Sequence, residues 1–119
     1  MHNESSKFLA ILRVELEDLM LDLKDAEEMY RGRFEKGDVS GHVLKENTAV
    51  LENELAGIRS VIQELRTIDA SRYETLDDLC KELHLVSLEA VKRLGFPAAL
   101  LGMMNRKCAK VKRYLAEAG

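Results

Sequence analysis

The chain has 119 residues, the length of one domain, which excludes a two-domain organisation. Apolar residues make up 46% of the sequence and charged residues 33%, a composition that disfavours both intrinsic disorder and a membrane-spanning chain. The net charge is -3, and the single proline, the absence of tryptophan and the scarcity of β-branched runs favour an all-α fold.

The first predicted helix spans residues 7–34, with Ser5 or Ser6 as its N-cap, because a serine hydroxyl can accept a hydrogen bond from a free backbone amide. Its apolar residues recur at alternating spacings of three and four, which places them on one helix face with coiled-coil character. Gly37 can adopt the left-handed conformation that ends a helix, and Asp38 can cap the next one. The apolar face comprises Leu9, Leu12, Leu16, Leu19, Leu23, Ala26 and Tyr30.

The second predicted helix spans residues 39–67 and repeats this pattern, so the two long apolar faces imply an antiparallel helical hairpin. Each arm of about 28 residues would be about 42 Å long at about 1.5 Å per residue. Gly57 follows Ala56, and this pair of small residues would permit the close approach of another helix. The apolar face comprises Leu44, Thr48, Leu51, Leu55, Ile58, Ile62 and Leu65.

Two shorter helices are predicted to follow, at residues 75–94 and 97–117. Two overlapping capping signatures precede the first of them, at Ser71 and at Thr75, each followed three residues later by an acidic residue. The apolar faces comprise Leu76, Leu79, Leu83, Val86 and Ala90 in the first helix, and Leu101, Met104, Cys108, Val111 and Leu115 in the second.

The junction between these two helices has a clear pattern. Gly95 is placed to be the left-handed residue after a helix, and Phe96 to fold back on the last turn. Pro97 is expected to be the first residue of the next helix, where its missing amide and fixed φ have no cost.

The four apolar faces predict a single domain, residues 1–119, that folds as a four-helix antiparallel bundle built from a long helical hairpin and a shorter one. Because the second hairpin is shorter, part of the first is expected to remain uncovered unless a second copy of the chain covers it. Further apolar residues lie off the main faces, and they indicate either a widened core stripe or a surface for a dimer or another partner. They are Phe8, Met20, Val50, Val61, Leu85, Leu88, Leu100 and Met103, of which Leu85, Leu88, Leu100 and Met103 are the predicted partner-binding residues.

The last predicted helix is basic, since from residue 92 onward seven lysines and arginines stand against Glu117 alone. One interpretation is that these cations complement the helix dipole and that the helix packs beside the acidic first helix. The alternative is a surface for an anion or a nucleic acid. The acidic chain and the lack of interleaved aromatic residues make nucleic-acid binding the weaker interpretation.

His42 lies near the start of the second predicted helix and is followed by Leu44 and Lys45. This short segment resembles the signature of histidine phosphotransfer domains, which are also four-helix bundles and in which leucine, lysine and glycine follow the phosphorylated histidine at the second, third and fourth positions. The resemblance implies a catalytic His42 that accepts a phosphoryl group and a Lys45 that holds its oxygens. Glu46 stands where that signature has glycine, and its carboxylate would repel a phosphoryl group.

Cys80 and His84 are spaced by four residues and could offer two ligands to a metal, but two ligands do not make a structural site. We expect Cys80 and Cys108 to be reduced thiols packed in the core of a cytoplasmic protein, because residues 1–7 do not have the pattern of a signal peptide. The sequence has no phosphate-binding glycine loop, nucleophile elbow, metalloprotease motif or dinucleotide fingerprint, so no cofactor and no metal are predicted.

The surplus of apolar residues and the lack of catalytic motifs predict a non-enzymatic helical interaction or adaptor module. It is expected to form a homodimer or to bind a helical protein partner, without contacting a membrane or a nucleic acid. The alternative prediction is a histidine phosphotransfer-like domain that uses His42 and Lys45.

Overall fold

The computed structural model describes residues 2–118 and the side chains of residues 4–117. Within this part of the chain the fold has four α-helices, one short 3-10 helix and no strand, which confirms the predicted all-α class. None of these helices is long and apolar enough to cross a membrane. The elements are α1 (His2–Glu35), α2 (Gly41–Leu65), η1 (Ala70–Arg72), α3 (Leu76–Leu94) and α4 (Ala99–Ala118).

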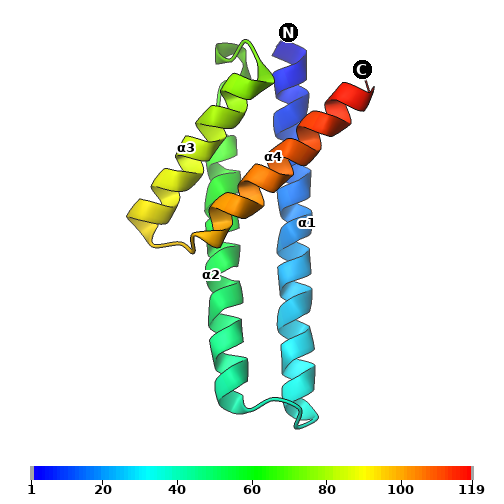
Figure 1. Cartoon of the computed structure of the whole chain (residues 1–119), viewed down its shortest axis with the longest axis vertical. Helices are drawn as coiled ribbons and strands as arrows, with labels where there is room; N and C mark the ends of the chain where they lie inside the picture. Colours follow the sequence, from blue (N-terminus) through cyan, green and yellow to red (C-terminus); the bar gives the residue numbers. More distant parts are fainter. Residues whose placement is uncertain (1, 119) are drawn as a thin grey trace.

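The four α-helices form two helical hairpins in two layers (Figure 1). The long hairpin consists of α1 and α2, and the shorter hairpin of α3 and α4 packs against its upper half. In this upper half α4 crosses α1 obliquely, and α3 lies alongside α2. The molecule measures 55 × 32 × 19 Å, so its smallest dimension is that of two helix layers. This is the predicted four-helix bundle of one long and one short hairpin.

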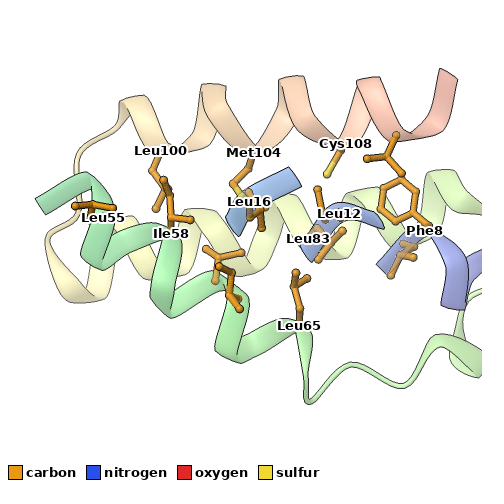
Figure 2. Packing of buried hydrophobic residues seen from close by; sticks show 14 of the residues in the cluster. Phe8, Leu12, Leu16, Leu55, Ile58, Leu65, Leu83, Leu100, Met104 and Cys108 are labelled. Carbon is orange, nitrogen blue, oxygen red and sulfur yellow. The ribbon is translucent and has the colours of Figure 1, made fainter. Parts of the chain in front are cut away.

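The hydrophobic core lies where the two hairpins overlap (Figure 2). Phe8, Leu12 and Leu16 of α1 are fully buried, and α4 directs Leu100 and Met104 toward the same cluster. Full burial of each such side chain contributes about 1.5–3 kcal/mol to folding. The buried cluster consists of Phe8, Leu12, Leu16, Leu23, Leu55, Ile58, Val61, Ile62, Leu65, Leu79, Leu83, Leu100, Met104, Cys108 and Val111.

Three of the predicted helix ends are confirmed. The Thr75 hydroxyl accepts a hydrogen bond from the Asp78 amide at 3.1 Å, so Thr75 is the N-cap of α3. Gly95 ends the same helix with φ 73°, and its amide donates to the Val91 carbonyl at 3.2 Å. Gly37 follows α1 with φ 79°, the left-handed backbone that glycine adopts without strain.

The other predicted helix ends are wrong by a few residues. The first helix begins at His2, and Ser5 is buried inside it beside the start of α3 instead of capping it. The N-cap of α2 is Ser40, whose hydroxyl accepts from the amide of Val43 at 3.1 Å, and this places the helix start two residues later than Asp38 would have done. Pro97 belongs to the turn that leads into α4, where its carbonyl accepts from the Leu100 amide.

Gly57 is a point of close approach between the two hairpins. A Cβ atom at this position would lie 3.0 Å from Cδ2 of Leu100 and 3.3 Å from Cγ of Phe96. The absence of a side chain therefore lets the start of α4 and the turn before it pack directly against the backbone of α2, as the small pair at this point predicted.

Candidate functional site

The lower half of the long hairpin is not covered by the rest of the chain (Figure 1). We call residues 24–54 the distal hairpin, which comprises the end of α1, the turn and the start of α2. None of these residues, all of which lie in the described part of the chain, is buried. The buried residues of α1 and α2 lie instead at Leu23 and before it, and at Leu55 and beyond. The core therefore ends at the level of the turn between α3 and α4.

One apolar stripe of α2 runs across this boundary. Val43, Val50 and Gly57 are spaced by seven residues and Val61 follows four later, so all four lie on one face of the helix. Gly57 and Val61 are buried under the shorter hairpin, whereas Val50 is 53% exposed and Val43 is also exposed. The same face is thus a core face at one end and a bare face at the other.

Aromatic and sulfur side chains add to the exposed apolar surface of the distal hairpin. Phe34 and Met29 of α1 are both exposed. The Phe34 ring lies close to Gly41, where a Cβ atom would lie 3.5 Å from its Cε1. The sequence pattern identified Val50 as an apolar residue off the main face but missed Val43 and Phe34. The seven-residue spacing of Val43, Val50 and Gly57 was the signal that could have identified Val43.

The four predicted partner-binding residues do not form one surface. Leu100 is fully buried against Gly57 and is unavailable to a partner, which corrects the prediction for this residue. Leu88 is half-buried on α3. Leu85 of α3 is 57% exposed and lines a hollow beside Cys80, whereas the half-buried Met103 of α4 lines a different hollow against α1.

The basic face of α4 packs against the acidic first helix. The side chain of Glu15, only 19% exposed, accepts hydrogen bonds from Lys110 at 2.7 Å and from Lys107 at 3.2 Å. The hydrogen bond from Lys110 is the main reason that the pKa of Glu15 is lowered, and that from Lys107 acts in the same direction against the effect of burial. The interpretation that this helix packs beside the acidic helix is therefore confirmed for these residues.

His42 and Lys45 lie at the tip of the long hairpin, in the first turns of α2. The His42 side chain is 78% exposed, and its Nε2 lies 3.0 Å from Oε1 of Glu46. Lys45 is also exposed. A carboxylate in contact with the imidazole is unfavourable for a phosphoryl group at that nitrogen, because both are negatively charged.

Cys80 and Cys108 meet across the contact between α3 and α4. Two interactions fix the antiparallel register of these helices: Lys112 donates to Asp77, and Nδ1 of His84 lies 3.2 Å from Oδ1 of Asn105. Cys80 and Cys108 lie between these two pairs, so the register places them opposite each other, and Cys80 packs against the buried cluster that contains Cys108. In the described part of the chain, no group of three or more histidine, cysteine or acidic side chains is arranged to hold a metal ion.

Comparison of the sequence and the structure with protein-family models, with curated proteins and with solved structures gives no significant match.

Proposed function

We propose that this protein is a non-enzymatic interaction module that self-associates as a homodimer through its distal hairpin. The observation that supports this most directly is the apolar stripe of α2, which is core at Gly57 and Val61 but exposed at Val43 and Val50. Exposed apolar surface that continues a core face is typical of an interface. Covering it with a partner removes apolar surface from water, as folding does for the buried part of the same face.

The shape of the open face favours a second copy of this chain as the occupant. The distal part of α1 is about 18 Å long and that of α2 about 21 Å, from a rise of about 1.5 Å per residue. Two distal hairpins related by a two-fold axis cover each other over that full length, since each is the same segment as the face it covers. The tip of one copy then lies next to the Gly95–Pro97 turn of its partner. The two facing hairpins continue the two-layer, four-helix packing along the dimer.

The charge pattern of the distal hairpin also suits self-association. Between residues 24 and 54 the chain carries five basic and eight acidic residues. Both signs of charge are therefore present, and two copies can meet without facing each other with charges of one sign alone. A two-fold arrangement can place basic side chains such as Arg31 and Arg33 opposite acidic ones of the partner at the rim of the interface. The apolar side chains that the dimer would remove from water are Met29, Phe34, Val43 and Val50.

The decisive experiment is the solution mass by size-exclusion chromatography with light scattering, for the native chain and for two matched variants. Val50→Glu places a charge on the proposed interface, whereas Leu85→Glu places the same charge on α3 at a similarly exposed position. We expect the native chain and Leu85→Glu to have twice the mass of one chain, and Val50→Glu to have the mass of one chain. Because Val50 is exposed, the helical circular dichroism of its variant should be preserved.

Two results would contradict the proposal. A native chain that remains monomeric at high concentration would mean that the face is free for a different helical protein. Loss of the dimer in Leu85→Glu but not in Val50→Glu would move the interface to the shorter hairpin.

A further inference from the structure

The pairing of Cys80 with Cys108 is the feature of the shorter hairpin that core packing alone does not require. Cys80 lies one helical turn after Asp77, and Cys108 one turn before Lys112, so the ion pair between Asp77 and Lys112 sets the two cysteines opposite each other. We propose that Cys80 and Cys108 form a reversible oxidation site, in which a peroxide converts the two thiols into a disulfide that joins α3 to α4. This proposal is independent of the proposed dimer.

The helix geometry permits this bond. Packed helices have axes about 8–10 Å apart and Cα atoms about 2.3 Å from each axis, which leaves facing Cα atoms about 3.5–5.5 Å apart. A disulfide usually joins Cα atoms about 4.4–6.8 Å apart, and the two ranges overlap. The register set by Asp77 with Lys112 and by His84 with Asn105 places Cys80 and Cys108 at the same level of the two helices, and Cys80 packs against the cluster that contains Cys108.

The two sulfur atoms differ in exposure, which assigns them different roles. Cys80 is half-buried and lines an open hollow of about 580 Å³ together with Asp77, Lys81, His84 and Leu85. Cys108 is buried in the core behind it. A small oxidant therefore reaches Cys80 first, and Cys108 is the thiol that resolves the oxidised form.

The electrostatics around Cys80 agree with this assignment. The pKa of the Cys80 thiol is lowered, mainly by the neighbouring Cys108 thiol and further by the positive charge of Lys112, while burial and Asp77 act in the opposite direction. The pKa of Cys108 is raised, mainly by the Cys80 thiol and then by burial. The thiolate is the reactive form, so attack on an oxidant falls to Cys80.

The reaction has two steps. In the first, the Cys80 thiolate attacks one oxygen of the peroxide, the O–O bond breaks, and the departing hydroxide takes up a proton to become water, leaving a sulfenic acid. In the second, Cys108 loses its proton and attacks the Cys80 sulfur, the S–O bond breaks, and the hydroxide leaves with that proton as a second water. The two thiols are oxidised by two electrons in total and the peroxide is reduced.

The test treats the reduced, full-length protein with hydrogen peroxide, then blocks free thiols with an alkylating reagent and measures the intact mass. These are the chain's two cysteines, so the result is unambiguous. We expect a single chain that has lost two hydrogen atoms, takes up no alkylating reagent, and regains both thiols after reduction. Alkylation of both thiols after oxidation, or a disulfide between two chains as the main product, would overturn the proposal.

Variants separate the roles of the two cysteines. In Cys108→Ala we expect Cys80 to accumulate as a sulfenic acid that a diketone reagent traps, whereas in Cys80→Ala we expect Cys108 to stay reduced. Circular dichroism checks that each variant is folded, and faster alkylation of Cys80 than of Cys108 in the reduced native chain provides a second reading if Cys108→Ala does not fold. Oxidation of Cys108 in Cys80→Ala at the native rate would contradict the assignment.

A positioning role for Lys112 can be tested in the same assay. We expect Lys112→Gln to slow the oxidation of Cys80 several-fold and Lys112→Arg to restore most of the rate, because arginine keeps the positive charge. The matched control is Lys110→Gln, which removes a neighbouring lysine that binds Glu15 instead. Equal rates in Lys112→Gln and Lys110→Gln would exclude Lys112 from the site.

Discussion

Gly57 and Gly32 are both glycines inside helices of the long hairpin, but their surroundings differ. A Cβ atom at Gly57 would press on Leu100 and Phe96, whereas nothing lies within 4 Å of one at Gly32. We expect Gly57→Val to destabilise the fold by about 1–3 kcal/mol through overpacking. Gly32→Ala should stabilise it by about 0.5–1 kcal/mol through helix propensity alone.

Urea unfolding of both variants measures these free energies. A Gly57→Val chain as stable as the native one would mean that α4 does not pack directly against α2 at this point.

Glu15 links α1 to α4 and makes stability depend on pH. Its pKa is lowered in the folded state by the hydrogen bonds from Lys110 and then Lys107, so folding favours the ionised carboxylate. The resulting stabilisation is present above the pKa of the unfolded chain and is lost as the pH falls through the lower folded pKa. We expect Glu15→Gln to remove about 1 kcal/mol or less at neutral pH, and to flatten the loss of stability between about pH 5 and about pH 3.

Denaturant titrations at several pH values would measure this effect, with Glu17→Gln as the control. Glu17 pairs with Arg13 on its own helix, and both side chains are about half-exposed. An identical pH profile for the two variants would mean that the contact between α1 and α4 contributes nothing to stability.

At the scale of elements, α4 completes the core. It supplies Leu100, Met104, Cys108 and Val111 to the buried cluster. A chain truncated after Leu94 would leave Phe8, Leu12 and Leu16 uncovered on one side. We therefore expect it to lose the cooperative melting transition or to aggregate, as measured by circular dichroism and light scattering. A sharp transition at the native temperature in the truncated chain would show that α1, α2 and α3 are sufficient.

The sequence predicted helix ends well where local chemistry decides them and poorly where packing does. Thr75 and Gly95 follow from capping and from left-handed backbone, which act within a few residues. Ser5 has the same capping chemistry, but it is buried beside the start of α3, so the helix continues through it. On α4, Leu100 rather than Leu101 is fully buried, because α4 crosses obliquely and Gly57 leaves room for Leu100. Neither the crossing angle nor the fit against Gly57 can be read from apolar spacing.

At the scale of the whole molecule, the uncovered hairpin was predictable because it depends on helix lengths alone. Apolar spacing does not show on which face of the long hairpin α3 and α4 pack. It therefore does not show that Val43 and Val50 continue a buried face. The same holds for the cysteine pair: their residue numbers placed them on adjacent antiparallel helices, but only the register set by Asp77 with Lys112 makes them neighbours.

The two halves of the molecule should differ in their local stability. We expect backbone amides of α2 near Ile58 and Val61 to exchange with solvent much more slowly than those near Val43 and Val50, since none of the distal residues is buried. As the protein concentration rises and the proposed dimer forms, hydrogen exchange of the distal amides should slow selectively. Uniform protection of both halves at every concentration would contradict this division of the hairpin.

The order of the chain gives α4 a particular place during synthesis. Phe8, Leu12 and Leu16 are made before the helix α4, whose residues cover them on one side. The nascent chain can therefore close the turn of the long hairpin early, from contacts that are near in sequence, while these apolar side chains stay exposed until α4 has left the ribosome. The interval before α4 emerges is therefore the period when this protein most needs a chaperone.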